Sequence, residues 1–366
     1  MSHKDIHYMA RALVLAARGR FTTDPNPRVG CVLVRKDEII AEGWHERAGQ
    51  PHAEVNALQK VDNALGATAY VTLEPCSYTG RTGPCCEALI DSGVERVVVA
   101  MEDPNPLVSG QGIEKLRLAG IEVICGVLQR DAMALNRGFI NRMRFGKPWV
   151  RSKLAMSLDG RTAMASGESR WITSDESRAD VQILRAESSA ILTGISTVLA
   201  DDPSLTVRLE HDCEAPVRVV LDSQLRMPLT ARMLSLPGET WVMTVNHNAE
   251  KITALQNAGA QVFVLPASDA NRVDLSAAFA CLAEQQINNI LVEAGATLNG
   301  VLLDQEWVDE WIIYMAPCVL GDRARGLFHL PGVNAMADRK NFKIRQVRQI
   351  GSDIKIQLQP NDEFDY

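Results

Sequence analysis

The chain has 366 residues, of which 46% are hydrophobic and 23% are charged, a composition typical of a soluble globular protein. A formal net charge of -7 offers no basic surface to a nucleic-acid backbone, and no apolar run approaches the ~20 residues that cross a bilayer. Because a single hydrophobic core stops growing near about 250–300 residues, this length favours two domains.

The first segment, "MSHKDIHYMARALVLAARGRF", is apolar only at helical spacing and lacks the cleavage pattern of a signal peptide. Met9, Ala10, Leu13 and Ala16 would form one face of an amphipathic helix. We therefore expect a cytoplasmic protein. Its eight cysteines should stay reduced there, and clustered cysteines should act as ligands or catalysts.

Residues 1–146 alternate predicted strands and helices, which indicates a layered α/β domain. Turn residues and glycines mark where these elements end. In chain order we expect a hairpin at 30–44, a helix at 52–60, a strand at 67–74, a helix ending at Gly93, a strand at 94–101, a helix ending at Gly120, and a strand after it.

A basic segment that contains Gly146 and Pro148 precedes a second series of alternating elements. We place a domain boundary there, which predicts one domain at 1–146 and another at 147–366. Ser174 should cap a helix that runs to Glu187. Strands are expected from Pro148 and at 189–194, 216–223, 240–245, 261–266, 288–295, 308–317 and 353–360.

Two segments of the first domain, "PHAEV" and "EPCSYTGRTGPCCEAL", carry residue types that bind metals. His52, Cys76 and either Cys85 or its neighbour Cys86 would give Zn2+ three ligands and leave the fourth tetrahedral position for water, as in catalytic zinc sites. Glu54 could reach that water without binding the metal and transfer its proton. Both ligand segments precede predicted helices, whose N-terminal dipoles favour thiolates.

Other interpretations of these residues exist, because an H-x-E sequence alone is common and an isolated histidine is more often structural. The combination of H-x-E with a later Pro-Cys and a further cysteine favours a catalytic zinc site. A structural zinc site in a binding protein would normally have four ligands and leaves Glu54 unexplained. A nucleic-acid base deaminase with an unrelated C-terminal module is disfavoured by the acidic balance and the lack of basic patches with interleaved aromatic residues.

The second domain has no GxGxxG, but "ILVEAGATLNG" places Gly295 and Gly300 between a predicted strand and a helix that starts near Thr297. Backbone N–H groups at such a helix start can bind a pyrophosphate. A tight strand-to-helix turn also requires glycine, so this signal is weak by itself.

Several of these motifs resemble a known family. His52-Ala-Glu54 and Pro75-Cys76 resemble the signature of zinc-dependent cytidine-deaminase-like enzymes, although eight residues rather than two separate the cysteines. "NPRVGCVLV" and the long "GRTGPC" loop are similar to the riboflavin-pathway deaminases, which aligns Cys85 rather than Cys86 as the third ligand. "SKLAMSLDGRTA", "GESRWITS", "ILTGISTVLADDPSLTVR" and "VEAGATLNG" resemble the riboflavin-pathway reductase domain, which has a dihydrofolate-reductase-like fold.

The resemblance implies a bifunctional enzyme that deaminates a phosphorylated diaminopyrimidine at a Zn2+ site and then reduces the ribosyl group with NADPH. Its partner would be this small substrate, with no nucleic acid or membrane, and the chain would form a homo-oligomer. The implied NADPH contacts are Ala155, Trp171, Thr197, Asp201, Ser223, Gly295, Ala296, Thr297, Leu298, Asn299, Gly300 and Val301. The implied reductase substrate contacts are Ser169, Arg185, Leu205, Arg208 and Glu293.

Residue chemistry adds further candidates for substrate binding. The planar guanidinium groups of Arg185 and Arg208 can each bind a ribose phosphate through two parallel hydrogen bonds. Lys153 could hydrogen-bond a ribosyl hydroxyl or assist protonation. For the deaminase, a cation, a hydroxyl and free N–H groups suit a phosphate, and the pyrimidine edge needs a hydrogen-bonding partner. The candidates are Arg81 and Thr82 for the phosphate, Asn26 for the pyrimidine, and His45 for the sugar phosphate, each of which could instead be a turn or surface residue.

Overall fold

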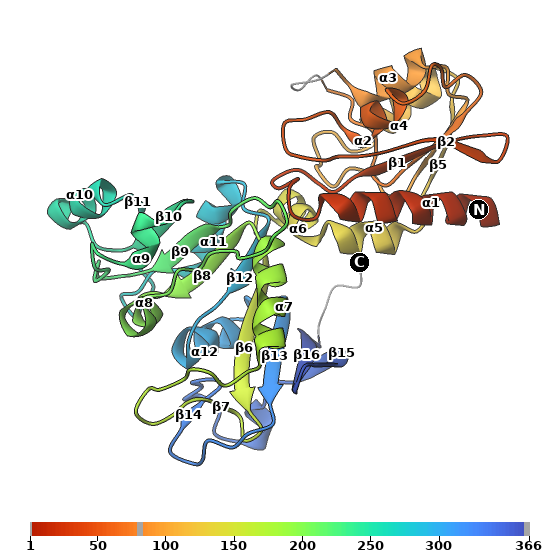
Figure 1. Ribbon diagram of the computed structural model, residues 1–366. Coiled ribbons are helices and arrows are strands. Elements are labelled where there is room, and N and C mark those ends of the chain that lie inside the picture. Colours follow the sequence, from red (N-terminus) through yellow and green to blue (C-terminus); the bar gives the residue numbers. More distant parts are fainter. Residues whose placement is uncertain (1, 79–82, 362–366) are drawn as a thin grey trace. The chain divides into compact units, whose positions relative to one another are not determined.

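The computed structural model describes residues 2–78 and 83–361 (Figure 1). The chain divides into two compact units. The first unit comprises Met1–Lys147 and Asp212–Glu214, and the second comprises Pro148–His211 and the residues from Ala215 onward.

The first unit contains a five-stranded sheet with the order β2-β1-β3-β4-β5. β1 is antiparallel to both of its neighbours, whereas β3, β4 and β5 are parallel. The strands are β1 (Gly30–Arg35), β2 (Glu38–Trp44), β3 (Thr68–Val71), β4 (Arg96–Val99) and β5 (Glu122–Cys125). The helices are α1 (His3–Ala16), α2 (Ala53–Leu58), α3 (Cys85–Asp91), α4 (Gln111–Leu118), α5 (Gln129–Leu135) and α6 (Arg137–Phe145), with a 3-10 turn η1 (Ala17–Gly19) after α1.

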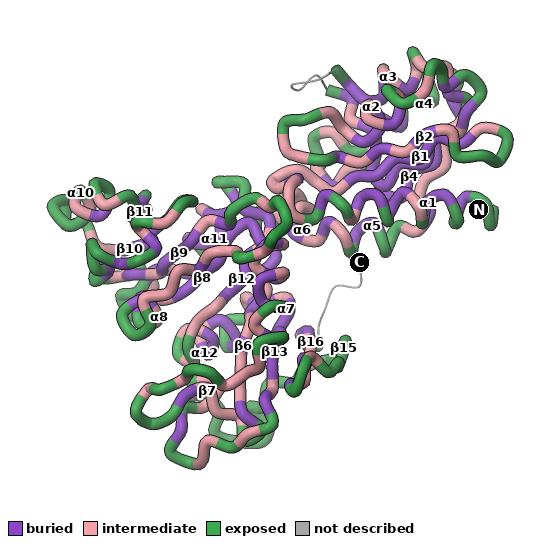
Figure 2. The backbone as a smooth tube through the Cα atoms, viewed as in Figure 1, coloured by how far each residue is buried: buried purple, intermediate pink, exposed green. Residues whose placement is uncertain are grey.

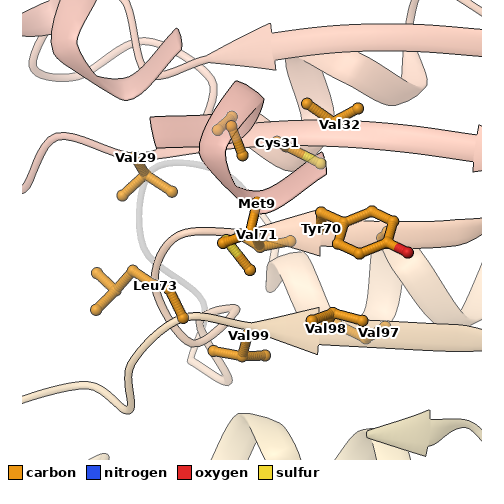
Figure 3. Close-up of a cluster of buried hydrophobic side chains, with 14 of the residues drawn as sticks. Met9, Val29, Cys31, Val32, Tyr70, Val71, Leu73, Val97, Val98 and Val99 are labelled. Carbon is orange, nitrogen blue, oxygen red and sulfur yellow. The ribbon is translucent and has the colours of Figure 1, made fainter. Parts of the chain in front are cut away.

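Helices cover both faces of this sheet. Figure 1 shows α1 and α5 along one face and α2, α3 and α4 on the other. Because both faces are covered, the central strands are continuously apolar, as in Val97, Val98 and Val99 of β4. Figure 3 shows Met9 of α1 among the buried side chains of these strands.

The buried face of α1 differs in part from the predicted one. Met9, Leu13 and Ala16 are buried, whereas Ala10 is exposed and Ala12 and Leu15 are buried instead. The hairpin predicted at 30–44 is confirmed as β1 and β2, whereas the strand expected at 67–74 is shorter and ends at Val71. The chain leaves the sheet there and carries the following residues toward the metal-ligand cluster described below.

The second unit contains a nine-stranded sheet with the order β11-β10-β9-β8-β12-β6-β13-β16-β15 and a small sheet of β7 and β14. The strands are β6 (Trp149–Ser157), β7 (Arg161–Ala163), β8 (Ala190–Gly194), β9 (Val217–Leu221), β10 (Thr240–Thr244), β11 (Ala260–Val264), β12 (Asn289–Val292), β13 (Glu310–Ala316), β14 (Arg325–Gly326), β15 (Phe342–Ile350) and β16 (Asp353–Pro360). The helices are α7 (Asp175–Ala186), α8 (Ile195–Asp201), α9 (Arg232–Ser235), α10 (Ala249–Asn257), α11 (Leu275–Glu284) and α12 (Ala296–Asp304), with a 3-10 turn η2 (Met336–Asp338).

Seven neighbouring strands of the large sheet, from β11 to β13, are parallel; β16 pairs antiparallel with β13, and β15 pairs antiparallel with β16. The helices α11 and α12 pack on one face, and α7, α8 and α10 pack on the other. Ser174 is the N-cap of α7, as predicted, and its side chain accepts a hydrogen bond from Ser177 N. Figure 2 shows the central strands buried and β15 exposed along most of its length.

The order of the parallel strands creates a point at which the chain reverses its direction across the sheet. The chain moves outward from β8 to β11 and then returns to place β12 between β8 and β6. In open α/β sheets, ligands bind beyond the carboxyl ends of the strands at such a reversal. The ends of β8 and β12 are therefore where a ligand of the second unit is expected.

Candidate metal and cofactor sites

Three predicted ligands of the first unit converge on one point. The ligand atoms of His52, Cys76 and Cys85 all lie within 4.8 Å of one another. His52 Nδ1 is 3.2 Å from Cys85 Sγ and 3.6 Å from Cys76 Sγ. Tetrahedral zinc with bonds of about 2.0–2.3 Å separates its ligands by roughly 3.5–3.8 Å, so this His/Cys cluster fits Zn2+.

Secondary structure explains why the three side chains meet. His52 is the N-cap of α2, Cys85 is the first residue of α3, and Cys76 follows the end of β3. Hydrogen bonding from the Cys85 thiol and N–H, together with His52, lowers the pKa of the Cys76 thiol despite its partial burial. A lowered pKa favours the thiolate that binds a metal.

The neighbouring cysteine faces away from this cluster. Cys86 is fully buried among the apolar residues of the core, and burial raises the pKa of its thiol. The structure thus brings Cys85, and not Cys86, to His52 and Cys76, a choice that residue spacing alone could not make.

Glu54 lies in the first turn of α2, two residues after His52, and is 3% exposed. Burial raises the pKa of its carboxyl to about 7, although the nearby His52 lowers it. A carboxyl group with a pKa near neutrality can both accept and return a proton under physiological conditions.

Asn26 and His45 lie next to each other beside the His/Cys cluster. Asn26 Nδ2 is 3.1 Å from His45 Nε2, and His45 Nδ1 is 3.1 Å from the Pro51 carbonyl oxygen. The His45 ring packs edge-on against that of His52. Burial lowers the pKa of His45, which favours the neutral imidazole, and both of its ring nitrogens have partners within the protein.

The predicted phosphate ligands Arg81 and Thr82 lie outside the described residues. On the described side of that loop, a pocket beside Cys76 is lined by Pro75, Ser77, Tyr78, Asp103 and Val108. Burial raises the pKa of Asp103. No local motif marks Asp103 in the sequence, so it was not among the predicted site residues.

A buried carboxylate anchors the backbone around this pocket. Glu74, two residues before Cys76, accepts hydrogen bonds at 2.9–3.3 Å from four N–H groups, those of Asp103, Gly110, Gly112 and Ile113. These donors belong to the loop before α4 and to the start of that helix. Glu74 therefore joins the Cys76 segment to the loop that carries Asp103.

The second unit contains a charged cluster formed by Lys153, Arg185, Arg208 and Glu293. Arg185 binds Glu293 through two hydrogen bonds, Nε–Oε1 at 2.6 Å and Nη2–Oε2 at 2.9 Å, and its Nη1 donates to the Thr206 carbonyl oxygen. Burial alone would raise the pKa of Glu293, but Arg185, Lys153 and Arg208 together lower it. Burial lowers the pKa of Lys153.

The predicted substrate ligands of the second unit differ in their hydrogen-bond partners and in their exposure. Each nitrogen of Arg185 donates one hydrogen bond within the protein, so Arg185 orients Glu293 and keeps one further N–H on each Nη. The Arg208 side chain is exposed. Leu205 is buried in an apolar cluster, whereas Ser169 is half-buried.

The predicted glycine loop opens α12, for which Gly295 is the N-cap. Asn299 donates to the Ala294 and Gly295 carbonyl oxygens and accepts from Ser152, which ties the loop to β6. A Cβ at Gly300 would lie 2.0 Å from the His329 carbonyl oxygen, so close packing requires glycine there.

Residues of this loop differ in their availability to a cofactor. Gly295 and Thr297 are exposed, Ala296, Leu298 and Val301 are half-buried, and Asn299 and Gly300 are buried. The N-terminus of α12 is thus open at the reversal point of the sheet. Exposed N–H groups at a helix start fit the pyrophosphate of a dinucleotide.

The other predicted cofactor contacts lie on several elements of the same unit. Ala155 is on β6, and Thr197 and Asp201 are on α8, which starts at the carboxyl end of β8. Trp171 is 69% exposed, with the Arg178 guanidinium 4.6 Å from its ring centre. Ser223 follows β9 and accepts a hydrogen bond from Val273 N at 3.0 Å.

The three-ligand His/Cys cluster and the buried carboxylate beside it define a zinc-dependent deaminase. The exposed N-terminus of α12, on the unit that also holds the charged cluster, defines a nucleotide-dependent reductase joined to it. Family models agree: residues 2–101 match the cytidine and deoxycytidylate deaminase zinc-binding region, and residues 148–356 match the RibD C-terminal domain.

Relatives are similar along nearly the whole chain. The riboflavin biosynthesis protein RibD of Escherichia coli (strain K12) is 51% identical over 368 residues, covering 97% of this chain and 99% of that protein. The Acinetobacter baumannii RibD structure (form 1) has a TM-score of 0.92 at 46% identity, with 98% and 99% of the two chains covered. A Thermotoga maritima structure, described as a diaminohydroxyphosphoribosylaminopyrimidine deaminase/5-amino-6-(5-phosphoribosylamino)uracil reductase, has a TM-score of 0.86 at 35% identity, with coverage of 98% and 99%.

The chain belongs to the RibD family of riboflavin biosynthesis proteins. It is a bifunctional deaminase and reductase that uses Zn2+ and NADPH, with a cytidine-deaminase-like first domain and a dihydrofolate-reductase-like second domain, as expected. Among the described residues, no helix has the length and apolar character needed to cross a membrane.

Proposed function

We propose that this chain deaminates 2,5-diamino-6-(5-phosphoribosylamino)pyrimidin-4-one and then reduces the ribosyl group, giving 5-amino-6-(5-phosphoribitylamino)uracil. The observation that carries the proposal is the convergence of His52, Cys76 and Cys85 beside Glu54. The Thermotoga maritima relative, described with the same two activities, supports the choice of substrate. Residues 1–146 would carry the deaminase and residues 147–366 the reductase.

In the deaminase step, Glu54 would accept a proton from the attacking water and return it to the departing amino group, which leaves as ammonia. Zn2+, held by His52, Cys76 and Cys85, would supply a water made acidic enough to attack at neutral pH. The Asn26 carboxamide donates to the neutral His45, which leaves its oxygen available to the pyrimidine edge. We propose Arg81 and Thr82 as ligands of the substrate phosphate.

In the reductase step, NADPH would supply the hydride, and the protein would align it with the first carbon of the opened ribosyl group. The α12 N-terminus at Gly295–Val301, with Ala155, Trp171, Thr197, Asp201 and Ser223, would hold the cofactor. Glu293 would bind sugar hydroxyls, and Lys153 would donate a hydrogen bond or proton there. Arg208 would bind the phosphate, because its exposed guanidinium has no hydrogen-bond partner among the described residues and can form the planar two-point contact that phosphates favour.

Two further properties belong to this proposal. The acidic balance of the chain supports an enzyme that binds no nucleic acid, and its eight free cysteines fit the reducing cytoplasm. The edge strand β15 exposes Ile344 and Val347, which supports a homo-oligomer because unpaired apolar edges favour association. Light scattering of the full chain gives the oligomeric state directly.

The proposed function is tested by measuring ammonia release and NADPH oxidation in one reaction with the wild-type protein. With the diaminopyrimidine phosphate as substrate, we expect one ammonia released per NADPH oxidised, with ammonia appearing first. A single-stranded oligonucleotide or tRNA is the control substrate. Ammonia release from the polynucleotide, and none from the free pyrimidine, would refute the proposal.

A further inference from the structure

A turn after β9 lies at the edge of the sheet where the cofactor would bind. The carboxyl ends of β12, β8 and β9 are successive neighbours in the sheet. With a spacing of about 4.8 Å between strands, the end of β9 lies roughly 10 Å from the end of β12 and the α12 N-terminus. That separation suits the adenosine end of a dinucleotide whose pyrophosphate rests on α12.

The turn is held rigidly by a buried carboxylate. Asp222 is fully buried, and its Oδ2 accepts hydrogen bonds from the N–H groups of Arg226 at 2.6 Å and Met227 at 2.8 Å. Leu225 has a φ of 52° and is 4% exposed, and Met227 is 5% exposed. Arg226 lies between these two buried side chains, and its own side chain is exposed, as is that of Gln224.

Two polar groups of this turn remain available to a ligand. The Ser223 hydroxyl oxygen accepts from Val273 N, which leaves its hydrogen for another acceptor. Among residues 2–78 and 83–361, no hydrogen bond or ion pair is formed by the Arg226 guanidinium. Arg185 and Arg218, by contrast, are committed to partners inside the same unit.

We propose that Arg226, together with Ser223, binds the 2′-phosphate of NADPH and makes the reductase prefer NADPH to NADH. The 2′-phosphate is the only group that distinguishes the two cofactors, and a guanidinium can bind it with two parallel hydrogen bonds. In dinucleotide-binding sheets an arginine near the end of a strand commonly fills this role. The inference rests on the proposed reductase function.

Calorimetry of the full chain tests the proposal without catalysis. Adenosine 2′,5′-bisphosphate and adenosine 5′-monophosphate serve as probes, since they differ only in the 2′-phosphate. In Arg226→Ala, we expect the Kd of the bisphosphate to rise about 10- to 100-fold, while the Kd of the monophosphate stays within about twofold. Arg226→Lys should recover part of this affinity, because it restores the charge but not the planar fork.

Arg272→Ala is the matched control. Arg272 is an exposed arginine next to Val273, in the loop that contacts Ser223, so its removal takes away the same charge from the adjacent loop. We expect it to change the Kd of the bisphosphate less than about threefold, as for a solvent-screened charge that makes no direct contact with the phosphate. Equal losses in the two alanine variants would overturn the proposal, as would an unchanged Kd in Arg226→Ala.

The same proteins give a second readout with whole cofactors. The ratio of NADPH affinity to NADH affinity, measured by cofactor fluorescence, should fall about 10- to 100-fold in Arg226→Ala through weaker NADPH binding alone. A wild-type protein that binds both cofactors equally would refute the role of Arg226 but leave the reductase intact. A wild-type protein that binds neither would refute the proposed reductase function itself.

Discussion

Arg185 and Glu293 form a bidentate ion pair across 108 residues of sequence, from α7 to the end of β12. Their side chains are only 13% and 12% exposed. The pair places a carboxylate at the reversal point of the large sheet, within the electrostatic reach of Lys153 and Arg208.

Replacing Arg185 by Ala should therefore lower stability as well as activity. Glu293 would stay largely buried without its partner, which typically costs about 3–5 kcal/mol. We expect the free energy of unfolding of the second unit to fall by about this amount, as measured by hydrogen exchange at β12 and β6 in the full chain. A loss below about 1 kcal/mol would show that the pair does not hold Glu293.

Arg208→Ala is expected to behave differently, because the Arg208 side chain is exposed. The free energy of unfolding should change by less than about 0.5 kcal/mol, as for most surface substitutions. The KM of the reductase for its phosphorylated substrate should rise about tenfold or more, consistent with loss of a charge-assisted contact. Steady-state NADPH oxidation gives the KM, and ammonia release checks that deamination is intact. An unchanged KM would contradict the phosphate assignment.

Glu74→Gln should loosen the zinc site without removing a ligand. Glutamine keeps one acceptor oxygen but places an NH2 group where backbone N–H groups now donate. We expect zinc transfer to a chelator to accelerate about 10- to 100-fold, a loss typical of removing a supporting contact around a metal site. A chromogenic chelator measures this rate.

The control for that experiment is Glu87→Gln, the same substitution in the first turn of α3 at a side chain that is 56% exposed. It should release zinc at the wild-type rate, and both variants should keep reductase activity. If Glu74→Gln and Glu87→Gln release zinc at equal rates, Glu74 does not position the Cys76 segment.

Stability of the first unit should depend on pH through Asp5. Hydrogen bonds from Arg96 hold the pKa of Asp5 well below its usual range, and burial opposes this only in part. A lowered pKa contributes stability above the unfolded value of about 4, and this stability is lost as pH falls through the folded value. The difference between wild type and Asp5→Asn should therefore be largest at neutral pH and shrink below about pH 4.

Hydrogen exchange of the α1 and β4 amides at pH 7 and at pH 4 and below measures this difference. Asp37→Asn is the control, because Asp37 pairs with Lys4 at the surface, where both side chains are more than 60% exposed. It should change stability by less than about 1 kcal/mol at either pH. A pH-independent difference for Asp5→Asn would contradict the account.

The zinc ligands could be predicted from the sequence because each sits at a helix start or strand end with a recognisable local motif, as in His52-Ala-Glu54. Residues that act through distant partners could not. Glu74 serves the segment of Cys76, but its four donors lie 29 to 39 residues away. The pairing of Arg185 with Glu293 was not predicted, because it is set by the tertiary fold.

The burial of a side chain was also not predicted where the backbone adopts a positive φ. Leu205 has a φ of 46° and lies buried in an apolar cluster, which the polar sequence around it did not indicate. The helices α8, α10 and α11 were not expected from the sequence. Their apolar faces became clear only once the sheet they cover was known.

The most direct test of the central claim, that one chain carries a deaminase dependent on Glu54 and a separate reductase, uses Glu54→Gln. We predict about one zinc per chain, no ammonia release and no NADPH oxidation when this variant receives the diaminopyrimidine phosphate. NADPH oxidation at the wild-type rate should return when the deaminated uracil phosphate is supplied instead. Ammonia release by Glu54→Gln, or failure to reduce the deaminated substrate, would contradict the account.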